Sequence, residues 1–228
     1  MDIIDELKGK VIVSSQASAG EPFYDMQAMK AMMQSVINGG AAGLRVAGNR
    51  DIKLAKEFGV TVIGLTKPEP LPVNWKEVVY ITPTLTEVNE IIEAGADIVA
   101  FDGTSRKRQN NCTLSEILSL IHSKGKLAMA DIATLEEGIN CAKLGVDIIS
   151  TTLSGYTQES LSDSADKPDF KLLQELVNSI DKPVFLEGRI WEVEDVRKAF
   201  ELGAHSVVIG SAITRPHLIT KRFVNYNN

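Results

Sequence analysis

The sequence has few cysteines, no excess of positive charge and no long apolar run. Its two cysteines, Cys112 and Cys141, show neither a disulfide framework nor metal-ligand spacing, so we expect ordinary intracellular thiols. A formal net charge of −6 provides no basic face, which argues against nucleic acid and anionic membranes as partners. No apolar run approaches the roughly 18 residues of a membrane-spanning helix, and residues 1–10 lack the apolar core of a secretory signal. We therefore expect a cytoplasmic protein.

Histidine is scarce as well. His122 and His217 fall in helical or turn segments, and His205 falls at a turn between a helix and a strand. None of the three is paired with a second ligand at a recognisable spacing, so the sequence predicts no metal site.

A segment centred on glycine recurs along the chain. At Gly95, Gly145 and Gly203, a helical stretch ends in glycine, a small residue and a turn residue follow, and a buried strand then begins. These glycines are separated by 50 and 58 residues, about the length of two strand–helix units. Repetition of this kind over 228 residues predicts an α/β fold, a single (β/α)8 TIM barrel that occupies residues 1–228 as one domain.

The strands and helices can be placed from the hydrophobic pattern. Strands are expected at residues 11–16, 44–46, 61–65, 98–102, 126–130, 148–150, 183–186 and 206–209. A short N-terminal helix is expected at 2–8, and further helices near 25–37, 50–57, 84–94, 113–123, 134–144, 168–179, 192–202 and 216–224. Residues 67–82 form a long, proline-rich loop in this scheme, within which 78–81 are expected to add a small extra strand. A flavodoxin-like sheet needs only about five or six strands, so eight favour the closed barrel.

Polar residues stand where these strands end. Enzymes of this fold place their catalytic groups at the carboxyl ends of the strands, so the residues there are the candidates for chemistry. In strand order they are Gln16, Arg45, Lys67, Asp102, Asp131, Thr151 with Thr152, Glu187, and Gly210 with Ser211.

Lys67 and Glu187 follow the third and seventh strands, which stand opposite one another in a barrel of eight. Such a pair suits abstraction of a proton next to a carbonyl, with neighbouring groups holding the developing enolate. A nearby carboxylate favours the ammonium form of Lys67, whereas desolvation and the charge of Arg45 favour the neutral amine. The alternative is a structural salt bridge across the opening of the barrel.

Arg45 and Asp131 are expected to form a second charged set at the same end of the barrel. Arg45 would hold a carbonyl or hydroxyl oxygen of the substrate, and Asp131 would accept sugar hydroxyls or orient Lys67. Asp102 precedes Gly103 and can simply terminate its strand, so it ranks below Asp131.

Small and basic residues follow the last two strands. Gly188 with Arg189 and Gly210 with Ser211 come after strands seven and eight, where barrels of this type commonly bind phosphate. Arg215 can add a charged donor, although its position before Pro216 also suits a plain helix start. A phosphorylated small molecule is therefore the expected ligand.

These strand-end residues resemble those of the N-acetylmannosamine-6-phosphate 2-epimerases, also called N-acylglucosamine-6-phosphate 2-epimerases, of sialic-acid catabolism. The likeness runs from VSSQA at 13–17 to RFV at 222–224. Its more specific stretches are GLR at 43–45, VIGLTK at 62–67, MADIAT at 129–134, TTLSGYT at 151–157 and GSAITRP at 210–216.

The resemblance implies a TIM barrel, usually dimeric, that needs no cofactor and interconverts N-acetylmannosamine 6-phosphate and N-acetylglucosamine 6-phosphate. It further implies roles for individual residues. Lys67 looks like the catalytic acid/base and Glu187 like the essential carboxylate. Gln16, Arg45 and Asp131 look like sugar contacts, and Gly188, Gly210, Ser211 and Arg215 like phosphate contacts. We also expect Thr152 and Tyr156 to contact the substrate and Arg189 to contact its phosphate.

Two features depart from the family pattern, and other functions remain open. Ser211 stands where the family often has glycine, and loop 68–76 is longer and richer in proline than expected. A Schiff-base aldolase using Lys67, and a barrel that only binds a sugar phosphate as a sensor or scaffold, are the alternatives. A metal-dependent pentose-phosphate epimerase is disfavoured because the histidine ligands are missing.

Overall fold

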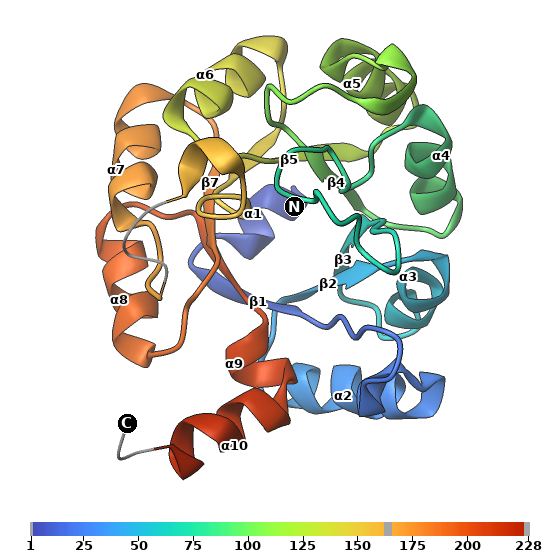
Figure 1. Cartoon of the computed structure of the whole chain (residues 1–228), viewed down its shortest axis with the longest axis vertical. Coiled ribbons are helices and arrows are strands. Elements are labelled where there is room, and N and C mark those ends of the chain that lie inside the picture. The colour runs from blue at the N-terminus through green and yellow to red at the C-terminus, as the bar shows by residue number, and fades with distance from the viewer. Residues whose placement is uncertain (1, 162–165, 226–228) are drawn as a thin grey trace.

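The computed structural model describes residues 2–161 and 166–225. Its strands form a closed barrel in which each strand pairs in parallel with the next along the chain, and β8 pairs with β1 (Figure 1). The strands are β1 Lys10–Ser14, β2 Gly43–Ala47, β3 Thr61–Leu65, β4 Ile98–Asp102, β5 Leu127–Asp131, β6 Ile148–Ser150, β7 Val184–Glu187 and β8 Ser206–Ile209. The expected TIM barrel is confirmed.

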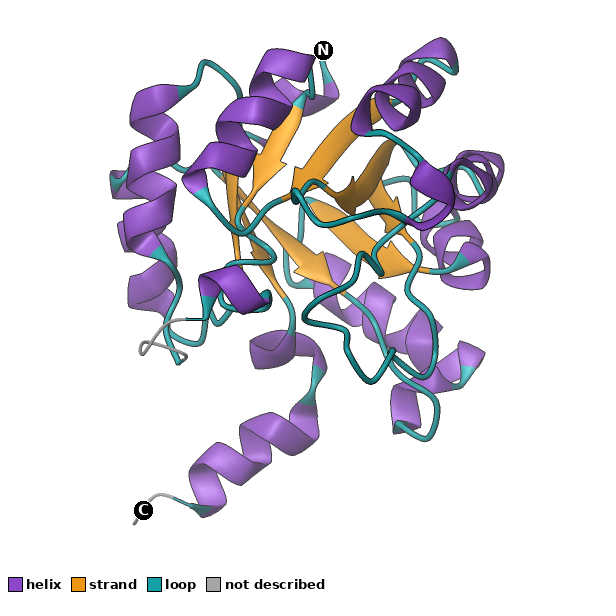
Figure 2. Ribbon diagram, turned by 45° about the horizontal axis from the view of Figure 1, so that its top comes forward, coloured by secondary structure: helices purple, strands orange, loops and turns teal. Residues whose placement is uncertain are grey.

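Helices accompany the strands, and most of them lie around the outside of the barrel (Figure 2). They are α1 Ile3–Leu7, α2 Met26–Asn38, α3 Asn49–Lys56, α4 Leu85–Glu93, α5 Leu114–Ser123, α6 Leu135–Leu144, α7 Phe170–Ser179, α8 Val193–Glu201, α9 Ser211–Thr214 and α10 Pro216–Val224, with short 3-10 turns at Pro22–Tyr24, Gln109–Asn111 and Gln158–Ser160. The helix α9, directly after β8, was not expected from the sequence. None of the helices in the described part of the chain has the length and apolar character needed to cross a membrane.

The N-terminal helix α1 lies against the start of strand β8. The hydroxyl of Ser206 donates a hydrogen bond of 2.6 Å to the backbone oxygen of Leu7, and a ring nitrogen of His205 lies 2.8 Å from that of Ile4. Leu7 is 1% exposed and belongs to the apolar cluster inside the barrel. The expected short N-terminal helix is therefore present, and it covers the amino-terminal end of the barrel.

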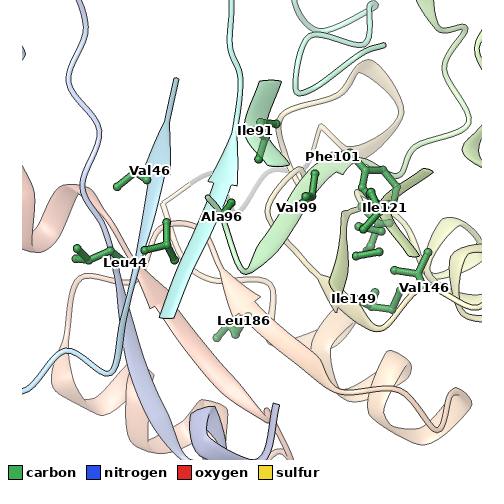
Figure 3. Close-up of a cluster of buried hydrophobic side chains, with 14 of the residues drawn as sticks. Leu44, Val46, Ile91, Ala96, Val99, Phe101, Ile121, Val146, Ile149 and Leu186 are labelled. Carbon is green, nitrogen blue, oxygen red and sulfur yellow. The ribbon is translucent and has the colours of Figure 1, made fainter. Parts of the chain in front are cut away.

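The strands alternate between two cores. In β4, Ile98 and Ala100 face the inside of the barrel, while Val99 and Phe101 join the layer between strands and helices. Figure 3 shows part of this outer layer, including Leu44 and Val46. Because side chains alternate with a period of two, the alternation decides which strand-end residues face the interior.

The segment from Lys67 to Pro83, which we call the strap, is a long irregular loop without the extra strand expected at residues 78–81. Val79, Tyr80 and Ile81 are buried, as the apolar pattern suggested. These residues, however, do not pair with a strand over several positions. The backbone oxygen of Ile81 accepts a single hydrogen bond of 3.1 Å from the backbone N–H of Asp102. One isolated bond cannot build a ladder, so the expectation of a strand was wrong.

Gly64 in β3 faces the helix layer at a point where the packing has no room for a methyl group. A Cβ atom there would lie 2.8 Å from side-chain carbons of Ala96 and Ile91 and 2.9 Å from one of Ile52. We expect Gly64→Ala to lower the free energy of unfolding by about 1–3 kcal/mol through overpacking, measured by urea denaturation.

Gly39→Ala is the matched control for Gly64→Ala. Gly39 is exposed and has right-handed helical backbone angles at the end of α2, and a Cβ atom there would meet the backbone oxygen of Val36, its nearest non-adjacent neighbour, at 3.3 Å, so alanine requires much less adjustment than at Gly64. Its effect should stay within about 0.5 kcal/mol. Equal stability losses in the two variants would contradict the packing argument.

Candidate active site

A cavity of about 340 Å³ opens at the carboxyl ends of the strands. Ten of the residues predicted to be functional line it: Gln16, Lys67, Thr152, Tyr156, Glu187, Gly188, Arg189, Gly210, Ser211 and Arg215. The alternation of β7 explains one of these positions, because Phe185 faces the barrel interior and Glu187, two residues on, faces the same way.

Arg45 and Asp131 do not line the cavity but lie beneath it. Their side chains are completely buried and form a bidentate pair, with guanidinium–carboxylate distances of 3.0 and 2.6 Å. The same guanidinium lies 3.2 Å from the carboxylate of Glu187. Burial alone would lower the pKa of Arg45, but the charges of Asp131 and Glu187 outweigh burial and hold it above its usual value.

Thr152 connects the two carboxylates. Its hydroxyl lies 2.7 Å from Asp131 and 3.1 Å from Glu187. A hydroxyl has one proton, so the Thr152 hydroxyl can donate to only one of the two carboxylates. Its contact with the other carboxyl group is favourable when that other group carries a proton. Burial raises the pKa of Glu187, against the opposing charge of Arg45. Protonated Glu187 can donate to Thr152, which in turn donates to Asp131, whereas the ion pair with Arg45 favours ionised Glu187, so the site accommodates both protonation states of this carboxyl group.

Lys67 stands at the start of the strap, on the opposite side of the barrel from Glu187. Its Nζ donates a 3.0 Å hydrogen bond to Gln16 Oε1, and Gln16 Nε2 donates to the hydroxyl of Ser14 at 2.9 Å. Lys67 is open to the cavity, yet protein surrounds its amino group closely enough for lost hydration to dominate. Desolvation, followed by the charge of Arg45, lowers the pKa of Lys67 to about 8, although Glu187 opposes the shift. About a tenth of the Lys67 amine is therefore neutral at pH 7, far more than for a lysine with its ordinary pKa.

The predicted phosphate contacts come from the loops after β7 and β8. Gly188 has a left-handed φ of 113°, and Gly210 precedes the short helix α9, which begins at Ser211. The guanidinium of Arg215 lies 3.0 Å from the carboxylate of Glu21. Backbone amides and a cationic side chain thus lie along one wall of the cavity, as an anionic group requires.

Arg189 also borders the cavity, but its guanidinium binds backbone carbonyls. Nη1 donates to the oxygen of Ser154 at 2.6 Å and Nε to that of Lys167 at 2.8 Å, while the group lies 5.4 Å from the ring centre of Tyr156. These contacts hold the loop after β6, so any phosphate contact by this guanidinium would have to compete with them.

Other lining residues were not foreseen. They are Ser14, Tyr80, Ile81, Leu153, Ile190, Trp191, Val208, Ile209 and Thr214. No local sequence pattern indicates that Tyr80 and Ile81 line the cavity, because they reach it only when the strap folds back over the strand ends. Trp191 could have been predicted to lie near the cavity, because it closely follows Gly188, the glycine after β7.

Asp102 is taken up by another interaction. Its carboxylate lies 2.6 Å from the guanidinium of Arg106 and accepts from the hydroxyl of Thr104 at 2.6 Å. It does not line the cavity. Within residues 2–161 and 166–225, no three His, Cys, Asp or Glu side chains are grouped so that they could hold a metal ion.

The fold and the site together define a class of protein. A closed (β/α)8 barrel with an amine and a carboxyl group on opposite walls of a cavity at its carboxyl end has the design of a barrel enzyme equipped for proton transfer.

Comparison with known proteins narrows this class. The model of the N-acetylmannosamine-6-phosphate epimerase family, NanE, matches residues 29–228. A relative from Clostridium perfringens named N-acetylmannosamine-6-phosphate 2-epimerase is 45% identical over 225 residues, covering 98% of this chain and 99% of the relative. One of the same name from Caldanaerobacter subterraneus is 46% identical over 229 residues, covering 99% and 94%.

A solved structure agrees with these sequence matches. The N-acetylmannosamine-6-phosphate 2-epimerase from Clostridium perfringens superimposes with a TM-score of 0.92 at 44% identity, covering 99% of this chain and 96% of that one. The chain therefore belongs to the N-acetylmannosamine-6-phosphate epimerase family, and it is an isomerase.

The lowered pKa of Lys67 can be measured by pH-dependent labelling with a lysine-selective reagent, followed by mass spectrometry. Because only the neutral amine reacts, labelling of Lys67 should rise with a midpoint of about pH 8. The charge of Glu187 favours the ammonium form of Lys67, so Glu187→Gln should move the midpoint to lower pH. Exposed Lys53 serves as the internal reference within the same sample. A midpoint for Lys67 near the ordinary lysine pKa of 10.5 would contradict the desolvation argument.

Proposed function

We propose that this protein interconverts N-acetylmannosamine 6-phosphate and N-acetylglucosamine 6-phosphate by removing and returning the proton at C2. The observation that carries the proposal is the pairing of Lys67, whose pKa is lowered to about 8, with a carboxyl group on the opposite wall. Membership of the epimerase family supports the substrate assignment.

The first step takes place on the open-chain sugar, in which C1 is an aldehyde. The neutral amine of Lys67 removes the proton from C2, and the electrons of the C2–H bond form the C1=C2 double bond of an enolate. The charge then rests on O1. Gln16 lines the cavity and bonds to Lys67, so it lies next to the reacting atoms. Arg45, buried beneath Glu187, contributes through its field rather than through contact.

The second step returns a proton to the opposite face of C2. Glu187 is suited to donate it, because burial raises its pKa and keeps the carboxyl protonated to higher pH. The double-bond electrons form the new C2–H bond, and the aldehyde is restored. A substrate hydroxyl or a water molecule could supply this proton instead. The reaction leaves the sugar neither oxidised nor reduced, so it requires no redox cofactor.

The phosphate anchors the substrate in this scheme. Backbone groups at Gly188, Gly210 and Ser211, together with Arg215, are the proposed contacts, and all four residues line the cavity. Arg45, Asp131 and Thr152 support the site from below by fixing Glu187. A cytoplasmic location stays a prediction of the sequence.

We also propose that the protein is a homodimer. Helix α10 extends away from the barrel (Figures 1 and 2) and has no buried residue. At its end Phe223 is 76% exposed and Val224 69% exposed. A second copy that covers this helix would remove the two apolar side chains from water.

Incubation with N-acetylmannosamine 6-phosphate in deuterated water, followed by proton NMR at C2, tests the proposed reaction. Wild-type protein should yield the gluco epimer with deuterium at C2. Lys67→Ala should slow exchange by roughly 100-fold or more because the base is lost, while phosphate-dependent binding persists. Glu187→Gln should reduce epimer formation more than exchange if Glu187 protonates the second face.

Lys53→Ala makes the same chemical change on the outer surface of α3 and should leave exchange unchanged. Undiminished exchange in Lys67→Ala would remove Lys67 as the base. Borohydride trapping of an adduct on Lys67 would instead support an aldolase. Binding without any exchange would support a sensor.

Sedimentation of the intact protein tests the dimer. We expect a mass near twice 24.8 kDa at micromolar concentration, and a shift towards the monomer in Phe223→Ser. Val193→Ser makes a comparable change at a residue that is 71% exposed on α8, and it should leave the mass unaltered. A monomeric wild type would contradict the proposal.

A further inference from the structure

The cavity has two chemically different sides. Most of its polar groups follow β1, β3, β7 and β8, with Thr152 after β6, and they include the proposed base and phosphate contacts. The opposite side carries apolar side chains, which we call the apolar wall: Tyr80, Ile81, Leu153 and Tyr156. Nothing in the proton-transfer scheme or in phosphate binding uses this wall.

Backbone hydrogen bonds place the apolar wall over β4, β5 and β6. The N–H of Asp102, the last residue of β4, donates to the oxygen of Ile81 at 3.1 Å. Leu153 follows β6, and its N–H donates to the oxygen of Ile132, just beyond β5, at 3.1 Å. Tyr80, Ile81 and Leu153 belong to one apolar cluster within the barrel. The wall therefore lies across the cavity from the loop after β8 and borders the loop after β7, where Arg189 lies against Tyr156.

Trp75 supports the wall from behind. Its ring centre lies 6.3 Å from that of Tyr80 in an edge-on arrangement and 6.4 Å from that of Tyr156. Both distances fall in the range of favourable aromatic pairs. Two segments distant in sequence, the strap and the loop after β6, are thereby joined into one surface.

Two arginines hold this surface in place. Arg106 Nη1 donates to the backbone oxygens of Trp75 at 3.2 Å and Lys76 at 3.1 Å, while Nη2 pairs with buried Asp102 at 2.6 Å. The guanidinium of Arg189 stacks against Tyr156 and bonds to the neighbouring loop. The wall is thus formed before substrate arrives, which is the condition for discrimination by shape.

The substrate of the proposed reaction has a distinctive apolar part. Hydroxyl, aldehyde and phosphate groups surround its carbon chain, and the methyl of the N-acyl group is the largest group without a polar atom. This acyl group is joined through its amide nitrogen to C2, the reacting carbon. It must therefore lie close to Lys67, the proposed base at C2. The phosphate, four carbons further on, lies at the other end.

We propose that the apolar wall is the subsite for the N-acyl group and that it sets the enzyme's preference for acyl size. This inference rests on the proposed function and adds to it the part of the substrate that fixes the orientation of C2. Tyr80 contributes a polar contact: burial raises the pKa of its hydroxyl to about 12, so the hydroxyl keeps its proton and can donate to the acyl oxygen. Leu153 and Ile81, each 1% exposed, close the back of the subsite and limit the length of the acyl chain.

A series of mannosamine 6-phosphates with N-formyl, N-acetyl and N-propanoyl groups tests the subsite through kcat/KM for epimerisation. In the wild type, N-formyl should be used about 10-fold less efficiently than N-acetyl, which is the loss expected for one methyl group in an apolar pocket. N-propanoyl should also be used less well, because the closed back of the wall leaves no room for it. Leu153→Ala opens that space, so the ratio of N-propanoyl to N-acetyl should rise by about 10-fold.

Ile190→Ala is the matched control. Ile190 lines the cavity just beyond β7, on the phosphate side, so its shortening should change kcat/KM for the three substrates by the same factor. Leu153→Val, a smaller change, serves if Leu153→Ala does not fold, and it should move the same ratio in the same direction. An acyl ratio that stays at the wild-type value in the folded Leu153 variants would overturn the proposal.

Calorimetric binding of the corresponding N-acyl glucosamine 6-phosphates separates failure of the subsite from failure of the proposed function. If the wild type shows no exchange at C2 with any substrate, the proposed reaction is wrong, while the acyl dependence of binding still tests the wall. Affinity that follows acyl length in the wild type and shifts in Leu153→Ala supports the subsite. Affinity that is indifferent to the acyl group rejects it.

Discussion

The buried pair between Arg45 and Asp131 is the interaction on which the site depends. Two full charges without access to water are tolerable only because each satisfies the other through two hydrogen bonds. The second charge near Arg45, that of Glu187, is held at 3.2 Å by the same guanidinium. Desolvation is the main cause of the lowered pKa of Lys67 across the cavity, and the positive charge that anchors Glu187 lowers it further. One buried arginine therefore adjusts both proposed proton-transfer groups.

The barrel supplies the geometry that this pair requires. Side chains in each strand alternate between the interior and the helix layer, so Arg45, Asp131 and Glu187 face inward from three different strands. The interior below them is filled by apolar side chains such as Ile63 and Phe185, both fully buried. Such packing prevents water from reaching the pair from the amino-terminal end and keeps the charges close to their positions.

The strap completes the cavity by closing the side that the strand ends leave open. Its first residue is Lys67, and its later part brings Tyr80 and Ile81 over β4. Arg106, paired with Asp102, bonds to the strap's backbone and ties it to the barrel. Lys67, the proposed base, and two residues of the apolar wall, Tyr80 and Ile81, therefore belong to one segment, so their separation is fixed by a loop that carries its own anchors.

The sequence by itself determined the barrel, the positions of its strands and the polar residue at the end of each. Strand alternation and glycine-ended helices are local patterns, and local patterns are readable without coordinates. Only the tertiary structure decided that Arg45 and Asp131 lie beneath the cavity, that Arg189 binds the loop after β6, and that 78–81 form no strand. These outcomes depend on contacts between segments distant in the chain, where packing and hydrogen-bond satisfaction outweigh local preference.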